Sequence, residues 1–351
     1  MNKKNFAVIG CGLVGSRWHS HVYHALPQCN LKAVCDLDIN SAQKTASMYH
    51  VPKYTGDYLD IANDEEIDAV SIATPDHLHK EIALSCIEAG KHILVEKPLA
   101  KKSQESKQIL EASREKNIIL AVDFHNRVNP NFINAKQIID SGKIGEIQYM
   151  NAKLNNSLNV PKKMLKWSNN SSPLWFLGPH TLDLGRWLVN SEIKSVYSVS
   201  QNKILKSAGI NSPDFYLSTI NFVNGSYMVM ENAWILPNSE PVVFNFKFEI
   251  VGSDGTIYIN SSDHRSVQVF ESQNHYLPDT VAGESFNNEV TGPEAKHVSR
   301  ISGFVYESIA RFADAVCYKT EPLANGRDGH AVTHGLESIE KSASTFQPVL
   351  L

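Results

Sequence analysis

The sequence has few cysteines, and they are not grouped. The five residues are scattered, without a CxxC pair or a Cys/His set at the spacing of a structural zinc site: Cys11, Cys29, Cys35, Cys86 and Cys317. We therefore expect reduced thiols, no metal site and a cytoplasmic protein.

Long apolar runs and a strong net charge are missing as well. No run is long enough to span a bilayer, and the N-terminus leads straight into a strand-like segment without the apolar region of a signal peptide. Lys and Arg number 33 against 37 Asp and Glu, a formal net charge of −4. Such a balance supplies no basic surface for nucleic acid and no polybasic membrane anchor, so neither partner is expected.

The composition is that of an ordinary globular protein, with 42% hydrophobic and 20% charged residues. A chain of 351 residues exceeds the usual span of one hydrophobic core, which predicts two domains.

The N-terminal segment carries a glycine-rich fingerprint. Phe6–Ile9 is a short apolar run suited to a buried strand, and Gly-Cys-Gly-Leu-Val-Gly follows directly at residues 10–15. In this pattern Gly10 permits a tight turn, Gly12 lets the backbone approach a diphosphate, and Gly15 lets helix and strand pack closely. The order of strand, turn and helix predicts a dinucleotide site.

A helix is expected from Gly15 to about Leu26, where Pro27 blocks further turns. Its unpaired N–H groups and dipole favour a diphosphate at its N-terminus, which places Leu13 and Val14 beside the cofactor.

The acid that such a site needs is present. Leu31–Cys35 is strand-like and ends at Asp36, whose carboxylate can accept hydrogen bonds from the adenosine ribose. Asp36 would repel a 2′-phosphate, and no Arg follows it closely, so NAD is favoured over NADP. An ordinary turn residue at the end of a strand is the alternative for Asp36.

Strands and helices continue to alternate, which predicts a parallel sheet with right-handed crossovers. The strands are expected at 69–73, 92–95 and 118–122, and the helices at 78–89 and 103–116. Thr74 and Pro75 leave the carboxyl end of one strand, where open α/β sheets bind ligands. They and His79 are plausible cofactor neighbours, with a simple turn and a solvated helix start as the alternatives.

Glu96, Lys97 and Pro98 leave the carboxyl end of the next strand. A lysine in a dry cleft beside a positive nicotinamide would have its charged form disfavoured, which suits it to proton transfer near neutral pH. An unperturbed surface lysine in a turn is the alternative.

These motifs together resemble those of the glucose–fructose oxidoreductase / inositol dehydrogenase / rhizopine-catabolism (Gfo/Idh/MocA) family, over nearly the whole chain. The most specific match is Gly-Lys-His-Ile-Leu-Val-Glu-Lys-Pro-Leu at residues 90–99. The other matches are the fingerprint at 10–15, Asp36, the segments 73–79, 126–127 and 142–145, and the C-terminal segments 328–329 and 342–344.

The resemblance implies a Rossmann domain with a parallel, doubly wound sheet, followed by an α+β domain with a large, mostly antiparallel sheet. That sheet commonly joins dimers or tetramers in the family. Typical substrates are sugars, polyols or inositols, oxidised or reduced through a bound nicotinamide. The resemblance also makes Lys97 and His180 the catalytic residues and places Glu96 and Lys97 at the cofactor and Arg127 at the substrate.

One position departs from the family pattern. Where the family has Asp-x-Gly-x-His, this chain has Phe-Leu-Gly-Pro-His over residues 176–180. Residues four apart share a helix face, so Phe176 puts an aromatic ring beside His180. Trp167 could stack on a sugar or belong to the core. A helix is expected over Thr181–Leu188.

Beyond residue 146 the sequence contains mostly strand-like segments, and Asn224-Gly225 and Asp254-Gly255 predict hairpins. We place a Rossmann domain at residues 1–125 and a substrate-binding and oligomerisation domain at 126–351, with C-terminal helices packing back on the first domain. The strands of this second part are expected at 147–154, 195–199, 215–222, 226–234, 244–251 and 256–259, and its last helices at 303–318 and 329–343.

The sequence therefore predicts an NAD-dependent oxidoreductase that moves hydride between nicotinamide and a sugar, polyol or inositol-like substrate. Two alternatives stay open. NAD could remain bound and be recycled in a redox-neutral reaction, or the chain could be a nicotinamide-binding regulator without catalysis.

Overall fold

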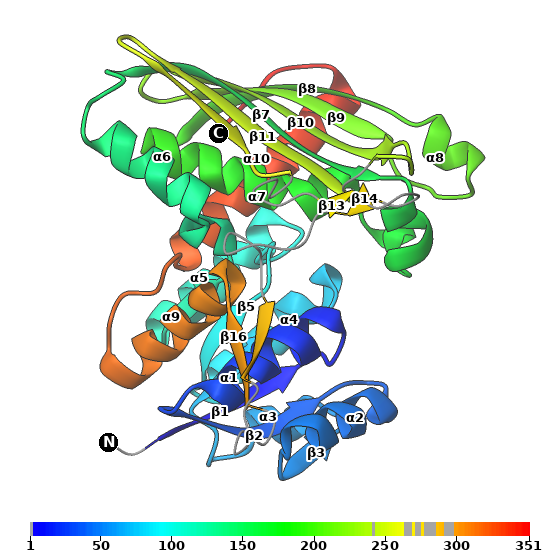
Figure 1. The fold of residues 1–351 in the computed structure, drawn as a ribbon, viewed down its shortest axis with the longest axis vertical. Helices are drawn as coiled ribbons and strands as arrows, with labels where there is room; N and C mark the ends of the chain where they lie inside the picture. The colour runs from blue at the N-terminus through cyan, green and yellow to red at the C-terminus, as the bar shows by residue number, and fades with distance from the viewer. Residues whose placement is uncertain (1–2, 241–242, 263–268, 271–274, 277–285, 291–297) are drawn as a thin grey trace. The chain divides into compact units, whose positions relative to one another are not determined.

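The chain forms two compact units (Figure 1). The computed structural model describes residues 3–240, 243–262, 269–270, 275–276, 286–290 and 298–351. Residues 1–129 and 281–330 make up the first unit, and residues 130–280 and 331–351 the second. The first unit extends past the boundary expected after residue 125 because η3 (His125–Val128) packs against α9 (Phe304–Tyr318).

A six-stranded parallel sheet is the core of the first unit, which confirms the predicted doubly wound α/β fold. Its central strands are largely buried, as the short apolar runs require, whereas the edge strand at residues 53–55 is partly exposed. Their order is β3-β2-β1-β4-β5-β6, with β1 Lys4–Ile9, β2 Cys29–Cys35, β3 Lys53–Thr55, β4 Ala69–Ile72, β5 His92–Val95 and β6 Leu120–Val122.

The crossovers of this sheet are helical. The predicted helix after the glycines is present, although its first turns are π-helical. The helical segments are η1 Gly15–Ser20, α1 His21–Ala25, α2 Ile39–Tyr49, α3 Leu59–Ala62, η2 Asp76–Leu78, α4 His79–Glu88 and α5 Ser103–Glu115.

A seven-stranded sheet is the core of the second unit. It is antiparallel except for the parallel pair of β7 and β10, and the two predicted hairpins join β9 to β10 and β11 to β12. The order is β12-β11-β7-β10-β9-β8-β17, with β7 Ile147–Ser157, β8 Ile193–Gln201, β9 Phe215–Phe222, β10 Tyr227–Leu236, β11 Phe244–Gly252, β12 Thr256–Asn260 and β17 Val349–Leu350.

The two faces of this sheet differ. One face packs on α7 and buries alternate side chains such as Met150, Leu154, Met228 and Met230. The opposite face carries exposed apolar side chains from five strands, among charged neighbours: Tyr149, Tyr197, Leu217, Tyr227, Val229 and Tyr258.

The helix α7 (Pro173–Val189) begins at Pro173, earlier than the Thr181 expected from the sequence. Ser172 caps it by accepting a hydrogen bond from the Trp175 N–H at 3.3 Å, and Pro173 fits the first helical position, where no N–H is needed. The helix then continues through Pro179, which the sequence-based expectation puts outside it.

The remaining elements are shorter or lie near the C-terminus. Within the described parts of the chain, no helix is both long and apolar enough to cross a membrane. The remaining elements are α6 Pro130–Asp140, η4 Val160–Met164, η5 Ser168–Asn170, α8 Ile204–Ser207, the pairs β13 Val269–Phe270 with β14 His275–Tyr276 and β15 Phe286–Val290 with β16 Val298–Ser302, and α10 Gly326–Thr345.

Candidate active site

The glycine turn has the geometry that its sequence predicts. Gly10 lies at φ +97°, and a Cβ there would collide with the carbonyl group of Ala73. A Cβ at Gly15 would collide with the Gly10 carbonyl oxygen, so the start of the helix can approach β1 only without a side chain. Gly12 faces open space, since a Cβ at this position would have no atom within 4 Å, which leaves its backbone accessible to a ligand.

Asp36 is held at the end of β2 by two backbone hydrogen bonds. Its Oδ2 accepts from the Cys11 N–H at 2.7 Å and its Oδ1 from the Asp38 N–H at 2.8 Å. The carboxylate is thus fixed against the glycine turn. Leu13 in that turn is 65% exposed and Val14 half-buried, so both can meet a ligand.

Thr74 and Pro75 follow β4, and both are half-buried. Thr74 Oγ1 is buried and has no hydrogen-bond partner among the residues described, as expected of a hydroxyl group that a bound molecule contacts. His79 lies under this segment, because its Nδ1 is 2.8 Å from the Pro98 carbonyl oxygen and its Nε2 is 3.0 Å from that of Thr74. We therefore expect His79 to act by holding the ends of β4 and β5 together.

Glu96 and Lys97 leave β5, with Glu96 buried and Lys97 half-buried. Glu96 Oε1 lies 3.0 Å from Nε2 of His19, and the other nitrogen of that ring lies 3.0 Å from Ser71 Oγ. Tyr23 extends the chain through its hydroxyl group, 2.6 Å from Ser71 Oγ.

Asp123 completes this buried cluster from the end of β6. Its Oδ2 is 3.8 Å from His19 Nε2, and its Oδ1 accepts a 2.5 Å hydrogen bond from Ser308 on α9. His19 and Asp123 are fully buried. Three consecutive strands of the sheet, β4, β5 and β6, thus each contribute a polar residue at or near their carboxyl ends.

The two carboxyl groups of the cluster have pKa values displaced in opposite directions. Burial alone would raise the pKa of Glu96, but the hydrogen bond and charge of His19, with the charges of Lys97 and His125, lower it to about 2. Burial and the nearby Glu96 charge raise the pKa of Asp123 to about 7. Near neutrality Glu96 is therefore the anion, whereas Asp123 keeps its proton up to about pH 7.

His125 follows the same cluster along the chain. Burial and the nearby charge of Lys97 lower its pKa to about 4, against the opposing charge of Glu96. The imidazole is thus neutral at physiological pH.

Sequence reasoning missed this cluster. His19, Glu96 and Asp123 bring ligand-type atoms within 4.8 Å of one another, a set that could hold a metal ion, although His19 and Glu96 already hydrogen-bond each other and Asp123 Oδ1 accepts from Ser308. One signal was available, because Asp123 follows a predicted strand just as Asp36 does.

Arg127, predicted at the substrate, is 7% exposed and paired within the first unit. Its guanidinium group contacts both carboxylate oxygens of Asp328, at 3.2 and 3.1 Å, and donates to the Leu323 carbonyl oxygen at 3.2 Å. This pairing anchors Arg127 within the first unit, and its contact with the substrate stays a prediction.

Phe176 and His180 lie on one face of α7 in the second unit. Both are half-buried, whereas every residue between them is buried. The Phe176 ring lies edge-on to Trp167, with centroids 6.0 Å apart, and 5.9 Å from the ring of the buried Trp234. The predicted substrate residues of this unit thus lie in or beside the N-terminal half of α7, and Trp234, which the sequence did not single out, contacts Phe176.

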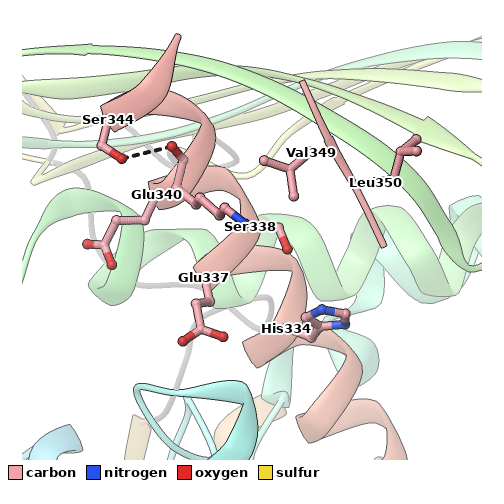
Figure 2. Close-up of a pocket in the computed structure, with 8 residues that line it drawn as sticks. His334, Glu337, Ser338, Glu340, Ser344, Val349 and Leu350 are labelled. Carbon is pink, nitrogen blue, oxygen red and sulfur yellow. Dashed lines mark hydrogen bonds between the residues drawn. The ribbon is translucent and has the colours of Figure 1, made fainter. Parts of the chain in front are cut away.

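A hollow of about 550 Å³ lies elsewhere in the second unit, along α10 and β17 (Figure 2). None of the predicted site residues lines it. Its lining is His334, Glu337, Ser338, Glu340, Lys341, Ser344, Val349 and Leu350.

Comparison with known families identifies both parts of the chain. A family model described as an oxidoreductase family with an NAD-binding Rossmann fold matches residues 4–124. A second, described as the GFO/IDH/MocA C-terminal domain, matches residues 132–258.

Individual relatives agree with these matches. The chain is 30% identical to levoglucosan dehydrogenase of Pseudarthrobacter phenanthrenivorans over 84% of this chain and 81% of the relative. It is 28% identical to scyllo-inositol 2-dehydrogenase (NAD(+)) of Bacillus subtilis over 76% and 77%. A solved levoglucosan dehydrogenase in complex with NADH superposes with a TM-score of 0.81, at 26% identity over 99% of each chain.

The buried cluster predicts a distinct dependence of stability on pH. Because folding raises the pKa of Asp123 from 3.8 to about 7, this group binds more protons in the folded state across that window. Its contribution to the free energy of unfolding therefore falls as pH rises from about 4 to 7. An amide mimics the protonated acid at every pH. We therefore expect the free energy of unfolding of Asp123→Asn, relative to that of the wild type, to be higher at pH 8 than at pH 5, as measured by urea unfolding.

Glu96→Gln is the matched control. Folding lowers the pKa of Glu96, so its charge stabilises the fold above about pH 4.5 and this contribution is lost as pH falls towards 2. The Gln variant should be less stable than the wild type at both pH 5 and pH 8. A wild-type pH dependence in Asp123→Asn would show that Asp123 holds no proton near neutrality.

Proposed function

The chain belongs to the GFO/IDH/MocA family of oxidoreductases, and we propose that it is an NAD-dependent dehydrogenase acting on a sugar, polyol or inositol-like substrate. The observation that carries this proposal is the carboxyl edge of the parallel sheet, where the glycine turn follows β1, the fixed Asp36 follows β2 and Lys97 follows β5. Ligands of open α/β sheets bind at this edge.

The residues of the first unit fit NAD. The open backbone at Gly12 and the N-terminus of η1 suit a diphosphate, and Asp36 offers carboxylate oxygens to the ribose hydroxyl groups. A 2′-phosphate would meet the negative charge of Asp36, which disfavours NADP. Thr74, Pro75, Glu96 and Lys97 are proposed to complete the cofactor site.

The chemistry divides between cofactor and protein. When bound, NAD supplies the acceptor or donor of hydride. Lys97 is proposed to take up or return the proton of the substrate hydroxyl group, since Glu96 next to it is anchored in the buried cluster. His180, in the second unit, is proposed to bind the substrate through a hydrogen bond, a task suited to a half-buried imidazole.

Net hydride transfer is favoured over the two alternatives. The relatives described above are named as dehydrogenases of levoglucosan and of scyllo-inositol, which supports net oxidation or reduction. Neither recycling of bound NAD nor a purely regulatory role has comparable support.

A homo-oligomer is proposed as the working form, built on the uncovered sheet face of the second unit. Exposed apolar side chains from five strands lie on that face together, and such patches commonly mark interfaces. The cytoplasm stays the proposed compartment, in keeping with five free cysteines.

The role of Lys97 predicts a far larger loss of turnover than of NAD affinity. Lys97→Ala should lower kcat about a hundredfold to ten-thousandfold, the usual share of general acid–base catalysis. Lys97→Arg should be as inactive, because a guanidinium group keeps its proton. Steady-state kinetics and NAD titration by calorimetry measure the two effects.

Lys102→Ala is the control, an exposed lysine five positions further along the chain. It should keep wild-type kcat. Lys97→Arg with near-normal kcat would remove Lys97 from proton transfer.

The proposed interface predicts that a charge on the sheet face lowers the assembled mass. Val229 is 48% exposed on that face, and Val229→Arg would bury a cation between subunits. We expect light scattering after gel filtration to give a dimer or tetramer for the wild type and a smaller species for the variant. Ile204→Arg, at a residue 47% exposed on α8, should keep the wild-type mass. A monomeric wild type would contradict the proposed assembly.

A further inference from the structure

The accessible face of α7 combines one imidazole with an aromatic surface. Phe176 and His180 are one helical turn apart, and Trp187 is the other half-buried residue of the helix. A substrate hydrogen-bonded to His180, as proposed above, would therefore have the Phe176 ring as its neighbour.

The Phe176 ring is fixed in place by two indoles. Trp167 meets it edge-on at an interplanar angle of 64°, and Trp234 lies against it at 59° with its own side chain fully buried. Offset and edge-to-face contacts of this kind stabilise a ring in one orientation. The surface beside His180 is thus aromatic and pre-formed.

An ionised partner for sugar hydroxyl groups is missing from this face of α7, a helix whose residues are all described. Asp183 is the one acid in the helix, and it is 1% exposed. A carboxylate would form charge-assisted hydrogen bonds with hydroxyl groups. A phenyl ring has no such acceptor, so hydroxyl groups packed against it lose their hydrogen bonds to water without replacement. Carbon-bound hydrogens lose no hydrogen bond on such a surface.

We propose that Phe176, held in place by Trp167 and Trp234, selects a sugar that lacks one hydroxyl group or has that oxygen bonded to a second carbon. The substrate class is a deoxy sugar, an anhydro sugar or a glycoside, in place of a fully hydroxylated sugar or inositol. The proposal rests on the proposed function, because it takes His180 as a group that binds the substrate.

The test uses matched substrates and the full-length protein with NAD. D-glucose is compared with its monodeoxy derivatives, its 1,6-anhydro form and its methyl glycoside, with myo-inositol included. We expect kcat/KM for at least one hydroxyl-poor sugar to exceed that for D-glucose and for myo-inositol about tenfold, the range for one group in an apolar pocket.

Two variants assign this preference to Phe176. Phe176→Asp supplies a hydrogen-bond acceptor and should reverse the ranking of the same pair of sugars. Phe176→Leu keeps an apolar side chain without the ring, and should reduce the preference about fivefold while retaining its direction. Trp187→Phe, two helical turns beyond His180 and against the Lys136 ammonium group, should leave the ratio unchanged. Thermal unfolding and NAD affinity establish that each variant is folded.

The outcomes separate this inference from the proposed function. A wild type that forms NADH but prefers D-glucose or myo-inositol overturns the inference alone. An unchanged ratio in both Phe176 variants also overturns it. A protein that binds NAD yet turns over none of these compounds contradicts the inference and the proposed function together.

Discussion

The hydrogen bond between His19 and Glu96 ties together the parts of the first unit that a cofactor site requires. His19 belongs to the helix that follows the glycine turn, and Glu96 ends β5 directly before Lys97. Ser71 and Asp123 connect the same imidazole to β4 and β6. Three strand ends and the glycine turn therefore share one buried polar cluster, and the position of Lys97 depends on it.

A cluster of this kind is costly unless each member has a partner. The order of the sheet brings the carboxyl ends of β4, β5 and β6 side by side, so that polar groups at these ends can pair with one another. Below about pH 7 Glu96 is ionised while Asp123 holds its proton, so the two buried carboxyl groups do not both carry charge there. The charge next to Lys97 is thereby fixed.

Much of this architecture could be predicted from the sequence. Short apolar runs ending in glycine or acid indicate a parallel sheet, and Asn-Gly and Asp-Gly indicate hairpins, because each pattern acts locally. The buried cluster depends on contacts between residues far apart in sequence, such as His19 with Glu96, and local patterns do not contain them. The sequence misplaces the start of α7 because Pro179 locally disfavours a helix that the Ser172 cap and the packing of α7 against its sheet nevertheless stabilise.

The site residues of the second unit follow from α7. Helical spacing alone put Phe176 beside His180, but only the folded unit reveals that Trp167 and Trp234 hold its ring. Each unit thus has its own pre-formed set of residues: a buried polar cluster next to Lys97 in the first unit, and aromatic rings beside His180 in the second.

The most direct test of this account is the stoichiometry of the reaction. The purified protein, given excess NAD and a panel of polyols and aldoses, should form NADH in equimolar amount with the oxidised product over many turnovers. Product that accumulates without NADH would contradict net hydride transfer to a dissociable cofactor.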